Sequence, residues 1–177
     1  MAVDGLNVAG QVVGLVVVDH GSKRAAANEM LVEVALMFKR VSGLGIVEPA
    51  HMELCEPTIE QAFDRCVEQG ATVVVVHPYF LSPGRHSTTD IPALAGAAAA
   101  RHPGVKFHVT QPLGLDEKIA AVMVERIGHC VGSGFSCGYC AGTGCEGNAR
   151  CGAGAAAGAR RNAGGREGDC QGVSDVV

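Results

Sequence analysis

The chain contains no tryptophan and few aromatic residues, which make up 4% of its 177 positions, and charged residues account for only 18%. Lys and Arg are scattered and are not interleaved with aromatic residues, which argues against a nucleic-acid surface. No long uncharged apolar run occurs, so we expect a soluble globular protein without a membrane span. Residues 1–11 lack a basic or Arg-rich stretch, so no export or transit signal is visible.

The eight cysteines and 25 glycines are unevenly distributed, because most of both follow residue 129. Clustered cysteines in an intracellular protein bind metal more often than they form disulfides. We therefore predict three regions: a compact α/β domain at 11–131, a cysteine-rich metal or cluster segment at 132–151, and a low-complexity, disordered tail at 152–177.

Apolar strand patterns alternate with helix patterns between residues 11 and 131, which is typical of stacked βαβ units. We predict a four-stranded parallel sheet flanked by helices, with strands at 11–19, 46–54, 72–76 and 106–110. The predicted helices run over 25–40, from Pro57 to Gly70, from a Ser87 or Thr88 cap to Arg101, and onward from Asp116. Right-handed crossovers bring the carboxyl ends of all four strands to one edge, where ligands of such sheets bind.

Two histidines lie in glycine-containing loops at this predicted edge, His20 in DHGS and His86 in SPGRHSTTD. Imidazole binds transition metals and accepts protons near neutral pH, so the two loops suggest a metal or proton-transfer site. His20 by itself is equally consistent with a loop histidine that bonds Asp19. A functional role is favoured for His86, because loops of this length after buried strands often carry catalytic groups.

Acidic and other histidine side chains flank these loops. Glu53, at the predicted end of the second strand, is a candidate to accept or relay protons, and Glu56 suits a helix-capping role better. We predict a structural role for His51, and for His77 either support of the site or a hydrogen-bonded position at a strand end.

Three further side chains could contact a ligand. Arg85 offers a two-pronged guanidinium for a carboxylate. Ser22, or the helix amino terminus beside it, could meet an anion. Lys23 could do the same, although a lysine near a helix start is more often an ordinary solvent charge.

The cysteines divide into two kinds. Cys55 and Cys66 are predicted to be small core residues. A glycine-flanked CxxC lets two thiolates reach one metal. Four thiolates for an iron-sulfur cluster or a zinc ion would come from Cys130, Cys137, Cys140 and Cys145, with Cys151 as the alternate fourth.

Four segments in this order, VVVDHGS, HMELCEPTIEQAF, VVVVHPYFLSPGRHSTTDIPAL and HPGVKFHVTQPLG, resemble the short sirohydrochlorin chelatases, the small form of the class II tetrapyrrole metal chelatases. The resemblance implies insertion of Fe²⁺ into sirohydrochlorin to make sirohaem, with release of two protons. It implies that His20 and His86 hold the substrate iron or take protons and that Glu53 is their acidic partner. Contacts to the macrocycle would come from Ser22, Lys23, Arg85 and Ser87.

A plant-type branch of this family carries a cysteine-rich extension with CxxCxGT, similar to residues 137–143 here. In that branch the extension holds a [2Fe-2S] cluster, so the resemblance implies such a cluster, with zinc as the alternative. It also implies a homodimer, because larger chelatases enclose one cleft between two α/β halves. The implied location is the chloroplast stroma, or the cytoplasm of a bacterium.

Three alternatives to iron insertion stay open from the sequence. Cobalt insertion for cobalamin synthesis is the nearest, because first-row ions compete for similar nitrogen ligands. A non-enzymatic tetrapyrrole or metal carrier would bind the same ligands without turnover. A zinc-bearing interaction module built on residues 132–151 is the third, and no nucleic-acid or membrane partner is expected.

Overall fold

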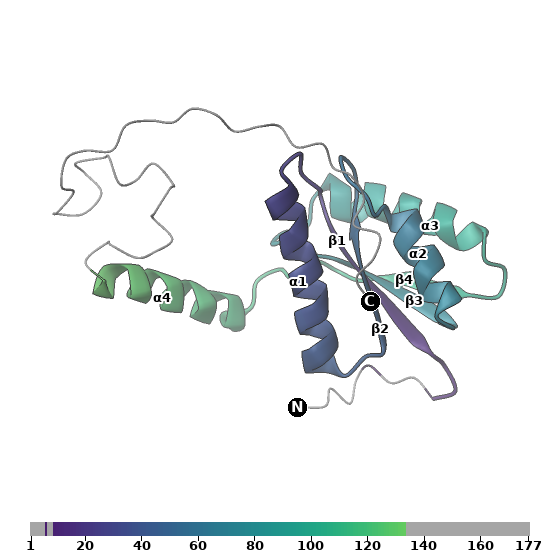
Figure 1. The fold of residues 1–177 in the computed structure, drawn as a ribbon, viewed down its shortest axis with the longest axis horizontal. Helices are drawn as coiled ribbons and strands as arrows, with labels where there is room; N and C mark the ends of the chain where they lie inside the picture. The colour runs from purple at the N-terminus through teal and green to yellow at the C-terminus, as the bar shows by residue number, and fades with distance from the viewer. Residues whose placement is uncertain (1–5, 7–8, 134–177) are drawn as a thin grey trace. The chain divides into compact units, whose positions relative to one another are not determined.

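The structure is a computed structural model that describes residue 6 and residues 9–133 (Figure 1). These residues fall into two compact units, the first ending at Gly114 and the second beginning at Leu115. Across the described residues, no helix combines the length and the apolar character that crossing a membrane requires.

The first unit is built on one parallel sheet of four strands in the order β2-β1-β3-β4. The strands are β1 (Val13–Asp19), β2 (Ile46–His51), β3 (Val73–Pro78) and β4 (Lys106–Val109). In the register, Asp19 stands beside His51 and Val17 beside His77. The predicted parallel sheet is confirmed, and the loops that follow its strands begin at one edge.

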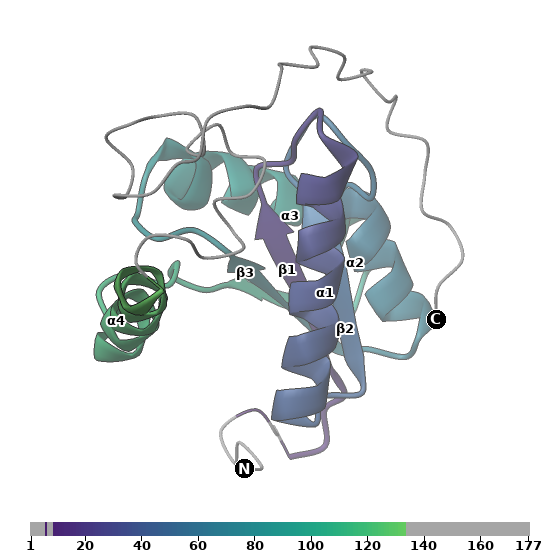
Figure 2. The same ribbon diagram turned by 60° about the vertical axis from the view of Figure 1, so that its left-hand side comes forward.

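Helices cover both faces of this sheet. They are α1 (Ala25–Ser42), α2 (Ile59–Glu68), the π-helical turn η2 (His86–Asp90) and α3 (Ile91–Ala100). Helix α1 lies on one face, and α2 and α3 lie on the other (Figure 2). Every connection between strands that are consecutive in the chain therefore contains a helix, as parallel strands require.

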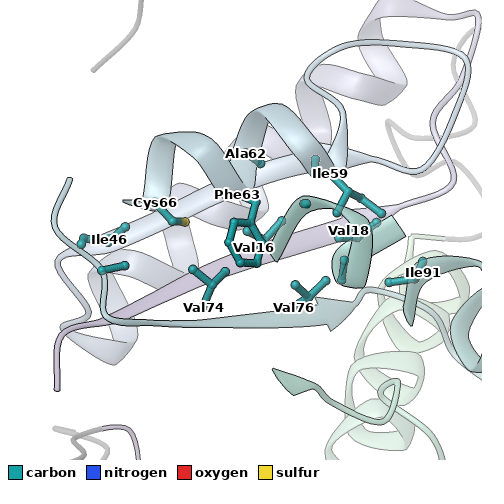
Figure 3. Close-up of a cluster of buried hydrophobic side chains, with 14 residues drawn as sticks. Val16, Val18, Ile46, Ile59, Ala62, Phe63, Cys66, Val74, Val76 and Ile91 are labelled. Carbon is teal, nitrogen blue, oxygen red and sulfur yellow. The ribbon is translucent and has the colours of Figure 1, made fainter. Parts of the chain in front are cut away.

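The larger core lies between the sheet and helices α2 and α3 (Figure 3). Val16, Val18, Val74 and Val76 of the sheet meet Ile59, Phe63 and Ile91 there, each at most 2% exposed. Leu15 and Val17 point to the other face and pack against Leu31 and Ala35 of α1. Because β1 is covered on both faces, its sequence is an unbroken apolar run rather than an alternating one. Burying one such side chain stabilises the fold by about 1.5–3 kcal/mol.

Helix α2 approaches β1 closely at Gly14, where an added Cβ would lie 3.0 Å from the Cβ atoms of Cys66 and Ala71. Cys66 is fully buried there, and burial raises the pKa of its thiol to about 12. Cys55 lies half-buried in the loop after β2. The predicted core position is therefore confirmed for Cys66 and wrong for Cys55.

The other strand and helix ends lie within two residues of their predicted positions, and three predicted boundaries differ in ways that affect the site. Strand β2 ends at His51 rather than at residue 54, and the chain folds back there, so that the His51 N–H bonds the Pro57 carbonyl. Helix α2 begins after Thr58, whose hydroxyl accepts from the Gln61 N–H in a capping box, and not at Pro57. A π-helical turn precedes α3, so Ser87 lies inside that turn and does not cap a helix.

The second unit contributes one described element, helix α4 (Glu117–Gly132). Asp116 caps it as predicted, because its carboxylate accepts from the Lys118 N–H at 2.8 Å. None of the α4 side chains is buried. Cys130 lies near the end of this helix and is partly exposed.

Candidate active site

The three side chains predicted to carry the chemistry follow three neighbouring strands. His20 comes directly after β1, Glu53 lies two residues after β2, and His86 begins η2 at the end of the loop that follows β3. Parallel strands end at the same edge of a sheet, which is why loops distant in sequence can meet there.

His20 and His86 do meet at this edge. Their ring centroids are 5.3 Å apart, and the ring planes cross at 74°. Nε2 of His20 lies 2.8 Å from Oε1 of Glu53. All three side chains are about half exposed to solvent, at 41%, 47% and 53% for His20, His86 and Glu53. The predicted meeting of the two histidines is therefore confirmed, and their chemical roles stay predictions.

Asp90 completes the His86 side of the site and was missed in the sequence. Its Oδ2 lies 2.9 Å from Nδ1 of His86, while its Oδ1 lies 3.6 Å from Nε of Arg85. The sequence signal that could have found it is the spacing of four residues between His86 and Asp90, because side chains at this spacing are neighbours on a helix. The site therefore holds two imidazole-carboxylate pairs, His20 with Glu53 and His86 with Asp90.

The loop that carries His20 is anchored to the loop that carries Glu53. Oδ1 of Asp19 accepts from the Gly21 N–H at 2.9 Å and from Nδ1 of His51 at 2.6 Å. The Glu53 N–H bonds the His20 carbonyl at 3.2 Å. Asp19 thus binds His51 and Gly21 rather than His20, and the structural role predicted for His51 fits its burial.

Gly21 allows the two loops to lie this close together. Its φ is +85°, and an added Cβ would lie 2.0 Å from the carbonyl oxygen of Glu53. Any other residue would suffer both the positive φ and this clash. The glycine therefore sets the spacing between the backbones that carry His20 and Glu53.

The residues predicted to contact the macrocycle have different surroundings. Lys23 is exposed, and Arg85 is 84% exposed. The Ser22 hydroxyl accepts from the Arg24 N–H at 3.1 Å. Ser87 is buried, and its hydroxyl bonds the main chain of Gly84, so in this structure it closes the turn before η2.

His77 has a hydrogen-bonded position at the end of β3. Nδ1 of His77 lies 2.6 Å from the hydroxyl of Thr110, and that hydroxyl donates to the Gln111 carbonyl. Burial lowers the pKa of His77. Of the two roles predicted for His77, these contacts fit the strand-end position.

Large apolar side chains are exposed in the same loops. Leu54 follows Glu53 with a left-handed φ of +70°, and Tyr79 and Leu81 lie in the loop between β3 and His86. Such a combination of a few polar groups with exposed apolar area suits a ligand that has a broad apolar face and charged edges.

Two groups of residues were predicted to bind metal, the histidines at the sheet edge and the cysteines of the cluster segment. Within residues 9–133, no group of three or more His, Cys, Asp or Glu side chains forms a ready metal cage. His20 and His86 are two half-exposed imidazoles at the same sheet edge, each beside a carboxylate. Of the predicted cluster cysteines, Cys130 lies in α4, while Cys137, Cys140, Cys145 and the alternate Cys151 lie outside the described residues.

Comparisons with known proteins give one family. The family model described as CbiX matches residues 14–130. The protein named sirohydrochlorin ferrochelatase, chloroplastic, from Arabidopsis thaliana is 50% identical over 125 residues, which are 71% of this chain and 56% of that protein. A sirohydrochlorin cobaltochelatase from Methanocaldococcus jannaschii is 33% identical and matches 63% of this chain and 95% of its own length.

Among solved structures, SirB from Bacillus subtilis with Fe³⁺ superposes with a TM-score of 0.61 at 32% identity. The match covers 64% of this chain and 45% of that one. The chain therefore spans about half the length of the Arabidopsis and Bacillus proteins and nearly the full length of the archaeal one.

Proposed function

The chain belongs to the CbiX family, and we propose that it is a chelatase that inserts Fe²⁺ into sirohydrochlorin, giving sirohaem and two protons. The observation that carries the proposal is the meeting of His20 and His86 at one sheet edge with Glu53 bonded to His20. The relatives named ferrochelatase and the Fe³⁺-containing SirB structure support iron as the metal substrate.

Metal insertion needs neutral ligands for a partly dehydrated ion and acceptors for two pyrrole protons. His20 and His86 supply two imidazoles whose ring centroids are 5.3 Å apart. Glu53 accepts a proton from His20 or from a pyrrole nitrogen and passes it to solvent, which its exposure allows. The reaction requires no nucleotide and no electron.

The macrocycle is a broad ring system with carboxylates at its edge. The exposed side chains of Leu54, Tyr79 and Leu81 would contact the ring. Lys23 and Arg85, both exposed, would pair with its carboxylates, and Ser22 would add a hydrogen bond. Ser87 was predicted to join them, and in this role it would have to exchange its bonds to Gly84.

A homodimer is the proposed assembly. The Bacillus relative is about twice as long as the matched region, whereas the archaeal relative has about the same length as that region. A second copy would supply the other wall of the cleft that a single sheet edge leaves open. Light scattering on the active fraction tests this proposal, and an active monomer would contradict it.

A [2Fe-2S] cluster on the cysteine-rich segment is proposed from the thiol-only donor set Cys130, Cys137, Cys140 and Cys145. Thiolates also suit zinc, so anaerobic purification followed by visible absorption separates the two, because zinc gives no visible bands. The chloroplastic relative supports the chloroplast stroma as the location.

The experiment that tests the function is anaerobic incubation of a large excess of sirohydrochlorin with Fe²⁺ and a catalytic amount of protein, followed optically. Turnover many times above the protein concentration is expected. A carrier would stop after one equivalent, and that result would overturn the proposal. Equal amounts of Fe²⁺ and Co²⁺ in one reaction then test the cobalt alternative. This alternative is tested because the archaeal relative is named a cobaltochelatase.

A further inference from the structure

We propose that Asp90 is a positioning residue that holds Nδ1 of His86 and so directs Nε2 of the same ring toward the incoming metal ion. The proposal deepens the proposed function and rests on it. Asp90 itself need not touch the ion or the macrocycle. It acts through the imidazole that does.

The hydrogen bond determines which nitrogen of His86 is available. Oδ2 of Asp90 lies 2.9 Å from Nδ1 of His86, and an ionised carboxylate can only accept. Nδ1 therefore carries the proton, and the lone pair of the neutral ring is on Nε2. Metal-ligating histidines commonly use such a carboxylate to set the tautomer and the ring orientation.

The two histidines differ in this respect. Nδ1 of His20 lies 3.2 Å from the Gly21 carbonyl, and Nε2 faces Glu53 at 2.8 Å, so both ring nitrogens have partners. Within the described residues, the His86 ring has a hydrogen bond at Nδ1 alone. The geometry thus singles out Nε2 of His86 as the first ligand for the ion.

The π-helical turn explains why the pair is held in place. The Ile91 N–H bonds the His86 carbonyl, five residues back, so the turn is wider than in an α-helix. This turn is also anchored at its start, because the hydroxyls of Ser87 and Thr88 both donate to the Gly84 carbonyl. Turns of this kind occur often at functional sites.

Arg85 contacts the other carboxylate oxygen of Asp90, so it does not compete with His86 for Oδ2. Its Nε lies 3.6 Å from Oδ1 of Asp90, and its side chain is 84% exposed, so this contact is weak. Oδ2 remains with His86 whether or not Arg85 turns to a substrate carboxylate. Asp90 can therefore accept the hydrogen bond from His86 while Arg85 binds a substrate carboxylate.

The test compares Asp90→Ala and Asp90→Leu, neither of which can accept a hydrogen bond, with the full-length wild type. Co²⁺ alone, without macrocycle, is titrated and followed by its visible absorption, and the spectrum of His86→Ala is subtracted to remove binding elsewhere, including at cysteines. We expect the Asp90 variants to bind Co²⁺ roughly 10–100-fold more weakly at this site. Iron insertion should lose kcat, while KM for sirohydrochlorin stays near the wild-type value.

Two further measurements separate positioning from general damage. Long-range ¹⁵N NMR of the histidine rings should report a proton on Nδ1 of His86 in the wild type and a shift toward Nε2 in Asp90→Ala. Asp90→Glu should restore part of the Co²⁺ affinity. Asp64→Asn removes the carboxylate of another pair, in which Nε2 of His102 lies 2.6 Å from Oδ1 of Asp64, and should leave Co²⁺ binding unchanged.

Wild-type Co²⁺ affinity and an unchanged His86 tautomer in a folded Asp90 variant would overturn the proposal. If Asp90→Ala fails to fold, the nearly isosteric Asp90→Leu decides. Failure of the proposed function looks different, because the Asp90 variants would still weaken Co²⁺ binding while the wild type inserts no iron. Co²⁺ binding that is unchanged in His86→Ala would also refute this role.

Discussion

The carboxylate of Asp19 holds the buried imidazole of His51, with Oδ1 and Nδ1 2.6 Å apart. Both residues end their strands, and they stand side by side in the register of β1 and β2. His20 follows directly after one of them, and Glu53 follows two residues after the other. The distance between His20 and Glu53 therefore depends on the bond between Asp19 and His51.

Asp19→Ala should damage both stability and activity. It leaves the Nδ1–H of His51, which is 1% exposed, without its acceptor, and this costs about 1–3 kcal/mol of unfolding free energy. The Gly21 N–H loses the same acceptor, so the insertion rate should fall further than the stability loss explains. Urea unfolding and initial rates measure the two effects. Glu68→Ala, at an exposed position of α2, should change neither.

Gly21→Ala should be worse than an ordinary glycine replacement. The new Cβ meets the Glu53 carbonyl and the φ of +85° strains the backbone, so we expect a loss above the 1–3 kcal/mol of the φ strain alone, together with weaker iron insertion. Gly43→Ala is the matched control, because its φ is +75° and nothing lies within 4 Å of its Cβ position. Equal losses of unfolding free energy in the two variants would contradict the clash.

His20→Ala and His86→Ala should each lower the rate of iron insertion by roughly 100-fold or more, because each removes a metal ligand or proton acceptor. His108→Ala replaces an exposed histidine of β4 and should keep the wild-type rate. The optical assay with sirohydrochlorin and Fe²⁺ measures all three. Full activity of either site variant would remove that histidine from the mechanism.

The unfolding free energy should decrease as the pH falls through 6.5, partly because of His77. Burial lowers the pKa of His77 from 6.5, so below that pH the unfolded chain binds more protons than the folded one. One such group contributes a slope of at most about 1.4 kcal/mol per pH unit. His77→Gln should flatten the acid side of the stability profile, measured by urea unfolding from pH 7.5 downward. His108→Gln serves as the control, and identical profiles would argue against the effect.

Cys66 should resist alkylation in the folded protein. Its thiol is buried with a pKa of about 12, and the thiolate is the reactive form. Iodoacetamide at pH 8, followed by digestion and mass spectrometry, should modify the half-buried Cys55 well before Cys66. Both cysteines should react at similar rates in urea. Rapid labelling of Cys66 in the native protein would show that its side of the core opens readily.

Much of the fold follows from local patterns in the sequence. The run Leu15–Val18 predicts a strand covered on both faces, and Gly43 marks the end of α1, where its φ is +75°. The parallel arrangement then follows from the alternation of strands and helices. The boundary at Thr58 was predictable in principle from its capping box with Gln61, which the Pro57 signal obscured.

The sequence by itself determined that His20 and His86 share one edge of the sheet, because parallel strands joined by right-handed crossovers leave no other place for loops that follow them. Only the tertiary structure decided which carboxylate serves which imidazole, Glu53 for His20 and Asp90 for His86. These pairings depend on a strand register, on a positive φ at Gly21 and on a π-helical turn after residue 85. Each of them is set by packing and hydrogen bonds between segments far apart in the chain, and local sequence preference does not encode such contacts.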